Sequence, residues 1–141
     1  MQRCPCCNAR LRGAAVCPRC QADLRAGIAA EQAADYWLGR AIHNCQSGSQ
    51  EEALHALQRS LWQKKTPLAL HFRNFLIAQC RNELLVLLAQ KELFLAKRLL
   101  YRRRSLLPLS RQLQQLQAFT DYLLVKHGFW TDARCEAAGN D

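Results

Sequence analysis

Four of the eight cysteines in this 141-residue chain stand in two closely spaced pairs near the N-terminus. Cys4 and Cys7 form the first pair, and nine residues separate it from the second pair, Cys17 and Cys20. A two-residue spacer lets one tight turn direct both sulfurs of a pair to a single ion. Zn²⁺ prefers four thiolates at the corners of a tetrahedron. The spacing therefore predicts one Zn²⁺ per chain, held by these four cysteines, with no coordination position left open for catalysis.

The residues around the cysteines indicate how such a site is built. A proline follows the first cysteine of each pair and sets the backbone for a turn, and Gly13 lies where the connecting segment must reverse. The sizeable aliphatic residues of the first 27 are Leu11, Val16 and Leu24. This is too little core for independent folding. We therefore expect a module over residues 1–27 whose stability comes mostly from the metal.

Three other chemistries remain open for the paired cysteines. They could form a redox-active pair, an iron centre with four thiolates, or disulfides. A redox pair normally opens a helix after a strand, and no strand pattern precedes either pair. The N-terminus also lacks the apolar stretch of a signal peptide. Paired cysteines without a leader favour a metal site in a reducing compartment, so we expect a cytoplasmic protein.

This segment resembles the small bacterial zinc-ribbon module, in which two Cys-Pro-x-Cys turns flank a hairpin. The matching residues are Cys4, Cys7, Cys17, Cys20, Ala22 and Leu24. The resemblance covers about one-fifth of the chain and implies a zinc site without catalytic activity. The chain departs from the pattern at Cys6, and also at Asn8 and Gln21, which replace the glycine after each pair. Asn tolerates a left-handed backbone better than Gln, so a distorted second turn is predicted.

From Ile28 onward the composition predicts helices. Ala, Leu, Gln, Arg and Glu dominate, and the apolar residues recur with helical period. We expect a mainly α protein in which the zinc module precedes a stack or bundle of about five helices over residues 28–130, with a flexible tail over 131–141. No apolar run is long and uncharged enough to span a membrane.

The first two predicted helices are separated by a clear break at residues 46–49. One face of the first helix carries apolar residues up to Cys45, and Ser49 can cap a second helix that begins at Gln50 and ends before Pro67. The apolar residues of these faces are Ala30, Ala33, Ala34, Trp37, Ala41, Cys45, Ala53, Leu54, Leu57 and Leu61.

This pair resembles a tetratricopeptide (TPR) helix pair. The matching residues are Trp37, Ala41, Gly48, Ala53 and Leu57. The resemblance implies a protein-binding helical repeat in which the small residues Ala41 and Ala53 let the helices approach closely.

An imperfect second copy follows after a shift of 43 residues. Ala53 then falls on Ala96, Leu57 on Leu100 and Gly48 on Lys91. The shift predicts helices over 68–90 and 92–104 with a turn near Lys91, and a single long helix over 68–104 remains the alternative. A last helix is expected to start near Leu109, with one face formed by Leu109, Leu113, Leu116, Thr120 and Leu123.

The apolar run 84–88 marks a candidate surface for a protein partner. A helix there is apolar on every side, so only one of its faces can pack inside. The candidate contact residues are Leu84, Leu85, Leu87 and Leu88. The intramolecular core is the competing interpretation of the same run.

Charge is unevenly distributed along the chain. Twenty Lys and Arg against eleven Asp and Glu give a net charge of +9. Residues 1–27 carry five Arg and one Asp, and residues 67–107 carry eight basic and two acidic residues. The densest cluster consists of Lys97, Arg98, Arg102, Arg103 and Arg104. It can be a solvated helix end, or it can contact phosphate or an acidic partner.

No catalytic motif is recognisable in the sequence. The histidines, His43, His55, His71 and His127, are isolated from one another, and Cys45, Cys80 and Cys135 are interpreted as buried or incidental thiols. We therefore expect a non-enzymatic adaptor or assembly protein that combines a zinc ribbon with TPR-like helices. The alternative is a zinc-dependent nucleic-acid-binding protein that uses the ribbon arginines and the basic cluster.

Overall fold

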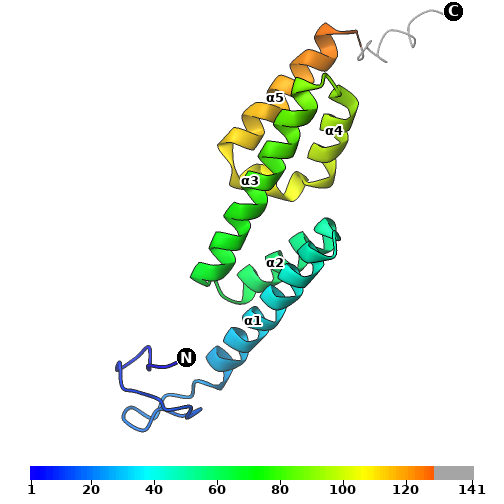
Figure 1. Cartoon of the computed structure of the whole chain (residues 1–141). Helices are drawn as coiled ribbons and strands as arrows, with labels where there is room; N and C mark the ends of the chain where they lie inside the picture. The colour runs from blue at the N-terminus through cyan, green and yellow to red at the C-terminus, as the bar shows by residue number, and fades with distance from the viewer. Residues whose placement is uncertain (129–141) are drawn as a thin grey trace, which may run out of the picture. The chain divides into compact units, whose positions relative to one another are not determined.

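The computed structural model describes residues 1–128 and is mainly helical, as predicted (Figure 1). An N-terminal segment with the cysteine pairs precedes the helices, and the described chain contains isolated β-bridges but no strand. The elements are α1 (Arg25–Gln46), α2 (Gln50–Gln63), α3 (Pro67–Ala89), α4 (Leu93–Arg102), the 3₁₀ helix η1 (Arg104–Leu109) and α5 (Arg111–Lys126). None of the described helices is long and apolar enough to cross a membrane. The predicted tail over 131–141 lies outside the described residues.

The chain divides into two compact units, Met1–Asn74 and Phe75–Asp141. In the first unit, α1 and α2 pack as an antiparallel hairpin. The buried hydroxyl of Ser60 donates a hydrogen bond of 2.8 Å to the backbone carbonyl of Ala34. Ala41 and Ala53 are completely buried. Small side chains therefore line the contact between the two helices, as the sequence predicted.

The turn between α1 and α2 depends on a left-handed residue. Gly48 has a φ of 80°. Its N–H bonds the carbonyl of Cys45 at 3.2 Å, and the N–H of Ser49 bonds the carbonyl of Asn44 at 2.9 Å. These two bonds form a Schellman motif that ends the first helix. Ser49 does occupy the N-cap position of α2, but its side chain accepts no capping hydrogen bond.

The predicted shift of 43 residues is confirmed in the backbone geometry. Lys91 has a φ of 61° in the turn between α3 and α4, where its counterpart is Gly48. Its N–H bonds the carbonyl of Leu88 at 3.1 Å, and the N–H of Glu92 bonds that of Leu87 at 2.9 Å. Both bonds repeat those of the first turn. The interpretation of 68–104 as one long helix is therefore wrong.

The second unit has a core in which α3 and α4 meet. Leu84, Ala96 and Leu100 form a buried cluster. Ala96 and Leu100 are as buried as their counterparts Ala53 and Leu57, so the 43-residue relationship extends from the turn into the packing.

The last helix begins slightly later than expected. Pro108 lies in η1, and the hydroxyl of Ser110 then caps α5 by accepting a hydrogen bond from the N–H of Leu113. Leu113 and Thr120 are fully buried, as predicted, whereas Leu109 is exposed. The prediction that Leu109 shares one face with Leu113 and Thr120 is wrong. Leu109 ends the 3₁₀ helix η1, so its side chain does not follow the α-helical spacing that begins at Arg111.

Candidate metal centre

Both cysteine pairs lie in turns with the same hydrogen bonds. In the first turn, the N–H of Cys4 bonds the carbonyl of Ala9, and the N–H of Asn8 bonds the carbonyl of Cys4, each at 2.9 Å. The second turn repeats both bonds thirteen residues later, at Cys17, Gln21 and Ala22, with distances of 2.9 and 3.0 Å. The isolated bridges Arg3 to Arg10 and Val16 to Asp23 follow the same shift. The metal module is therefore a pair of like halves.

The expected distortion of the second turn is not found. Asn8 has a φ of 58° and Gln21 a φ of 55°, so both residues occupy the left-handed region that glycine would occupy in the zinc-ribbon pattern. Gln21 adopts this conformation because the hydrogen bonds on either side of it are formed in full. The consequence is backbone strain at Gln21 rather than a change in the shape of the turn.

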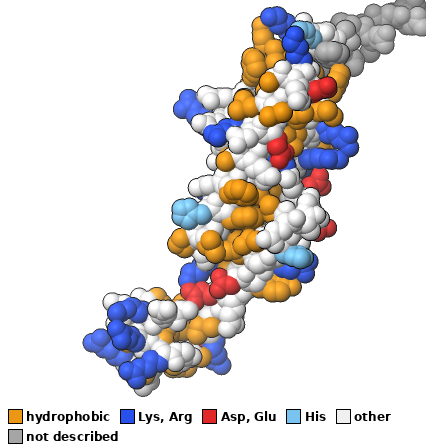
Figure 2. Space-filling view, viewed as in Figure 1, with side chains coloured by type: hydrophobic (Ala, Val, Ile, Leu, Met, Phe, Trp, Pro, Cys, Tyr) orange, Lys and Arg blue, Asp and Glu red, His pale blue; other side chains and the backbone are white. Residues whose placement is uncertain are grey.

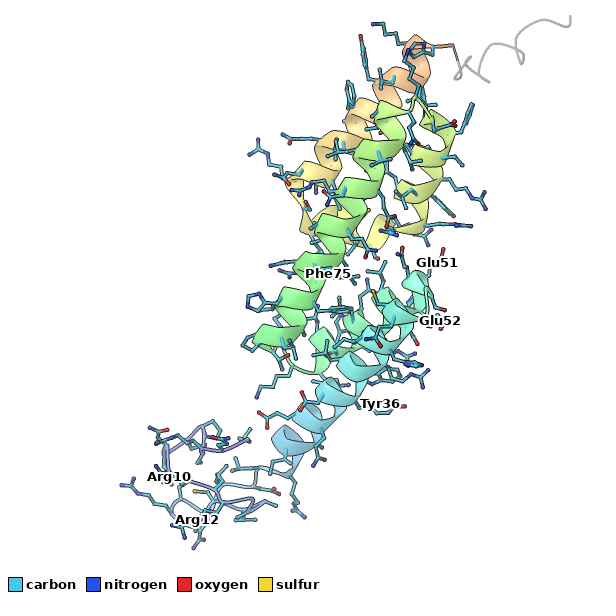
Figure 3. All side chains as sticks on the ribbon, in the orientation of Figure 1. Arg10, Arg12, Tyr36, Glu51, Glu52 and Phe75 are labelled. Carbon is cyan, nitrogen blue, oxygen red and sulfur yellow. The ribbon has the colours of Figure 1, made fainter. Side chains whose placement is uncertain are left out.

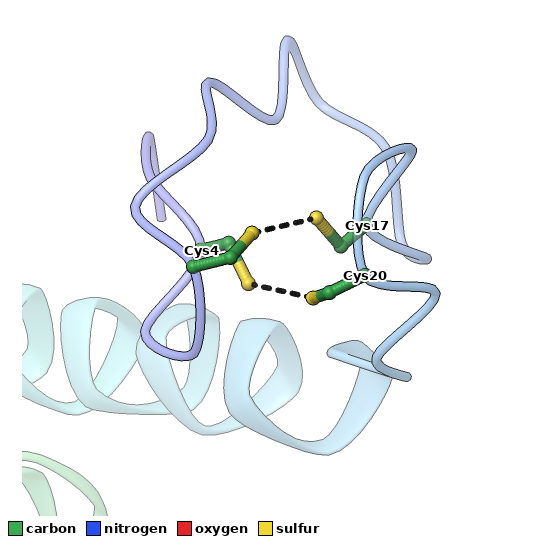
Figure 4. Close-up of side chains that lie close together, drawn as sticks. Cys4, Cys17 and Cys20 are labelled. Atoms are coloured by element: carbon green, nitrogen blue, oxygen red, sulfur yellow. Dashed lines mark hydrogen bonds between the residues drawn. The ribbon is translucent and has the colours of Figure 1, made fainter.

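The four cysteine sulfurs come together as the spacing predicted. All four lie within 4.8 Å of one another. The Sγ atoms of Cys4 and Cys20 are 3.6 Å apart, and those of Cys7 and Cys17 are 3.5 Å apart (Figure 4). A tetrahedral ion with metal–sulfur bonds of about 2.3 Å would separate its ligands by about 3.8 Å, so this donor set fits one ion. No disulfide joins any two of the four, because their closest sulfurs lie well beyond the S–S bond length of about 2.0 Å.

The shifted pKa values within the cysteine cluster also favour a bound cation. Backbone N–H groups in the turns lower the pKa of Cys4, and those of Cys20 and Arg19 lower the pKa of Cys17 to about 6. The N–H of Ala22 lowers the pKa of Cys20, but the three neighbouring sulfurs and burial raise it, and the pKa is about 12. Backbone N–H groups thus stabilise the thiolate forms of Cys4 and Cys17, whereas the neighbouring sulfurs disfavour the thiolate form of Cys20. A divalent cation removes that conflict by neutralising the shared charge.

Cys6 is exposed and lies outside the cluster of four. The negative charge of Cys4 raises the pKa of Cys6, so its thiol keeps its proton more readily than an isolated cysteine. One intervening residue places Cys6 on the outside of the turn that holds Cys4 and Cys7. Cys6 is therefore a neighbour of the ligand set rather than a member of it.

The module has a small core of its own and is fastened to the first helix. Leu11 and Leu24, which are equivalent in the two halves, are buried with Cys4 and Cys17. Ile28 at the start of α1 packs against this core. The carboxylate of Glu31 then pairs with the N-terminal ammonium group and with Lys64 at the end of α2. One carboxylate therefore links the module to both helices of the first hairpin.

The connection between the two halves is a tight turn. The N–H of Ala14 bonds the carbonyl of Leu11 at 2.8 Å. Arg12 and Gly13 between them have φ values of 48° and 86°. Positive φ at both central residues is the pattern of type I′ turns, which reverse antiparallel segments. The predicted role of Gly13 is confirmed, and Arg12 is displayed at the tip.

The ribbon arginines remain available to a partner. Arg10 and Arg12 extend away from the module (Figure 3), and basic side chains gather over it in the space-filling view (Figure 2). Arg3 and Arg10 lie opposite each other across a bridge. Like charges in that arrangement repel. Asp23, the acidic residue of the segment, is already paired with Arg25 at 2.7 Å.

The basic cluster predicted near the end of α4 is divided by the fold. Arg103 is only 8% exposed, and its guanidinium pairs with Glu83 at 2.8 Å. Lys97 pairs with Asp121. The role predicted for Arg103 as a phosphate contact is wrong, because its charge is buried against α3. Arg98, Arg102 and Arg104 are exposed, and Arg104 stacks on the ring of Tyr101.

Arg103 also contacts a buried thiol. Burial raises the pKa of Cys80, while the charge of Arg103 and its hydrogen bond to the sulfur lower it. The net direction is upward, so Cys80 is a neutral core thiol, as interpreted from the sequence. His43, His55 and His71 are exposed on the helices, and His127 is exposed directly after α5. Cys135 lies outside the described residues.

The apolar run 84–88 divides between core and surface. Leu84 is completely buried, and Leu87 and Leu88 pack against the α3–α4 core. Leu84 is therefore no surface contact residue, because α4 covers it. Leu85 and Val86 are 46% and 54% exposed. Of the four predicted contact residues, Leu85 is therefore the one that remains exposed.

No family model matches the chain, and no curated protein or solved structure matches it either. The resemblances to a zinc ribbon and to TPR helices remain predictions from sequence motifs. The geometry shows a cluster of four cysteines able to hold one metal ion, at the start of a mainly helical chain.

Two features of the site were missed from the sequence. The thirteen-residue relationship was readable, since Cys-Pro-x-Cys is followed after two residues by Arg10-Leu11 in one half and Asp23-Leu24 in the other. The role of Glu31 had no such signal. Nothing in its local sequence reveals a partner 33 residues away at Lys64.

Proposed function

We propose that this chain is a non-enzymatic adaptor or assembly protein with one structural Zn²⁺, and that its helices bind a protein partner. The observation that carries the proposal is the set of large apolar side chains that are exposed on the described helices. Trp62 on α2 is 91% exposed, Val125 on α5 is 58% exposed, and Phe119 on α5 is 49% exposed. Exposed aromatic side chains such as Trp62 and Phe119 are enriched in surfaces that become covered on binding.

The metal centre supports a structural rather than a chemical role. Four protein thiolates fill the tetrahedral coordination of Zn²⁺ and leave no position for substrate or water. The ion would therefore hold the two halves of the module together. It would also fix the direction of the ribbon arginines relative to α1, to which the module is fastened through Glu31.

The adaptor function is tested by capture followed by reconstitution. The zinc-loaded full chain is used to capture proteins from its host cells at moderate salt, and each captured protein is then purified and titrated by calorimetry. We expect one partner to bind stoichiometrically, to survive nuclease treatment and to lose little affinity when salt is doubled. Failure of every purified candidate to bind directly would contradict the proposal.

A second candidate function is nucleic-acid binding through the ribbon. The observation that favours it is that Arg3, Arg10, Arg12 and Arg19 form no ion pair within residues 1–128. No aromatic residue lies in residues 1–27. Such a surface would contact phosphates without stacking on bases, so binding would be insensitive to sequence.

The two functions are separated by their response to salt. Duplex binding through the ribbon predicts a slope of about −0.9 in log affinity per log salt for each phosphate contact. Replacing Arg10 and Arg12 together with Gln should reduce the slope by about two units, whereas replacing Arg98 and Arg104 provides the control from the helical region. Submicromolar nucleic-acid affinity at physiological salt with this pattern would favour the second function over the first.

A further inference from the structure

An open groove of about 490 Å³ runs between α3 and α5 in the second unit. Arg81 and Leu85 line it from α3, one helical turn apart, and Gln112, Leu116 and Phe119 line it from α5. The residues on α5 recur at intervals of three and four and therefore form a single stripe along that helix. The groove is the space between two adjacent helices of one compact unit.

The groove has a basic end and an apolar end. At the basic end, the guanidinium of Arg81 donates hydrogen bonds to the amide oxygens of Gln112 at 3.2 Å and Asn82 at 3.4 Å. Amides orient the guanidinium without cancelling its charge. At the apolar end, Leu85 is 46% exposed and Phe119 is 49% exposed. The two ends are separated by the four residues from Arg81 to Leu85, which is about 6 Å along a helix.

Among residues 1–128, no carboxylate lines the groove. Glu83 and Asp121, on the two helices that form it, are each engaged by a basic residue of the α4 region, namely Arg103 and Lys97. Residues 75–128 contain nine basic and three acidic residues, a net charge of +6. Within residues 75–128, Arg81 therefore has no counter-charge at the groove, and a negatively charged partner would be both attracted and oriented.

We propose that this groove binds an acidic amphipathic helix of a partner protein. The partner helix places a Glu or Asp against Arg81 and a Leu or Phe between Leu85 and Phe119, with the two side chains four residues apart on one face. This spacing follows from the separation of the two ends of the groove. The inference rests on the proposed adaptor function and specifies its binding surface and the chemistry of its partner.

The test uses synthetic helical peptides and the zinc-loaded full chain. One peptide carries Glu and Leu four residues apart along an apolar face, and the matched peptide carries Lys in place of Glu. We expect the acidic peptide to bind at least about tenfold more tightly by fluorescence anisotropy. The substitutions Leu85→Ala and Phe119→Ala should each weaken it by about fivefold or more, as expected for anchor contacts.

Two further variants make the test specific. Arg81→Gln removes the charge and keeps a hydrogen-bonding side chain, so it should bring the two peptides to within about twofold of each other. Val86→Ala is the matched control, because Val86 is 54% exposed beside Leu85 but does not line the groove. The affinity of Val86→Ala for the acidic peptide should stay within about twofold of that of the parent chain. Circular dichroism verifies that each variant is folded.

The assignment is overturned if the acidic and basic peptides bind equally to the parent chain. It is also overturned if Leu85→Ala binds like Val86→Ala, or if neither peptide binds at about 1 mM. The wider function fails in a different way. A captured partner that binds Leu85→Ala and Phe119→Ala with full affinity would refute the groove and leave the adaptor function standing. Binding of the acidic peptide, with no captured protein that binds directly, would refute the adaptor function and leave the groove assignment standing.

Discussion

The metal module and the helical region each contain two like halves, but different interactions stabilise the two regions. In residues 1–24 the halves repeat after thirteen residues and meet at four sulfurs, with Leu11 and Leu24 as their small shared core. In the helical region the hairpins repeat after 43 residues, and buried Ala and Leu side chains join their helices. A short chain cannot bury enough apolar surface to fold alone, so we expect the module to depend on a bound metal ion where the helices depend on packing.

The largest expected effect comes from removing one metal ligand. Cys17→Ser should abolish stoichiometric zinc binding and disorder residues 1–24, because structural zinc sites contribute on the order of 10 kcal/mol to such modules. Elemental analysis of protein purified without added metal should fall from about one zinc per chain to near zero, while far-UV circular dichroism keeps most of its helical signal.

Cys6→Ser is the matched control for this prediction, because Cys6 lies outside the cluster and should leave the zinc content unchanged. Iron in place of zinc would show itself in the same elemental analysis. Zinc retained by Cys17→Ser would refute the ligand assignment, and loss of the helical signal would show that the two regions fold as one.

A cavity created in the α1–α2 hairpin should instead destabilise the helices and leave zinc binding unchanged. Leu57 is 2% exposed, so Leu57→Ala should lower the free energy of unfolding of the helices by about 2–5 kcal/mol. Zinc content should remain at one per chain. Thermal melts of the variant, compared with those of the exposed substitution Trp62→Ala, measure the effect. An equal change in both variants would mean that Leu57 contributes nothing through burial.

The buried arginine of the second unit provides an intermediate effect. Arg103→Met keeps most of the apolar volume but leaves Glu83 without its partner, and we expect destabilisation by about 1–3 kcal/mol. Arg104→Met, which alters an exposed neighbour, should change stability by less than about 0.5 kcal/mol. Denaturant titration distinguishes the two variants. Equal stability of the two variants would show that Arg103 contributes no more to stability than an exposed arginine.

Left-handed residues allow the two regions to be compared at equivalent positions. Gln21 and Lys91 both have positive φ, and the other copies have Asn8 and Gly48 there. Gln21→Gly and Lys91→Gly should each relieve about 1 kcal/mol of strain. The first should raise zinc affinity by about fivefold in chelator competition, and the second should raise the melting temperature of the helices. Gly48→Ala should lower that temperature, although the added methyl group meets no atom within 4 Å.

The smallest expected effect concerns the link between the regions. Hydrogen bonding from Lys64 and from the N-terminal ammonium group lowers the pKa of Glu31 from its ordinary value of 4.5. The folded state thus favours the carboxylate, so the stabilisation is present above about pH 4.5 and is lost as pH falls through the lowered pKa. Glu31→Gln should cost about 0.5–1 kcal/mol at pH 7. The free energies of unfolding of the parent and of Glu31→Gln should become equal at pH values below the lowered pKa. A difference that stays constant with pH would contradict the link.

The parts predicted correctly from sequence were those with a local or periodic signal. The spacing of Cys4, Cys7, Cys17 and Cys20 was sufficient to bring their sulfurs together, and the 43-residue shift located the turn at Lys91 without a glycine. Arg103 was misplaced because a run of three arginines gives no indication of which one faces Glu83. Its burial depends on a contact between α3 and the end of α4, which periodicity within a single helix does not encode.

The likeness of the two cysteine turns bears on how the module closes. A metal ion bound at the first turn meets an equivalent pair of thiolates whether the second turn comes from the same chain or from another molecule. The choice is therefore made by local concentration. A nine-residue connector with a tight reversal at Arg12 and Gly13 keeps the second turn at an effective concentration in the millimolar range or above. We therefore expect closure within one chain to prevail over metal bridging between chains at ordinary protein concentrations, and a longer connector to shift the balance toward exchange of half-sites.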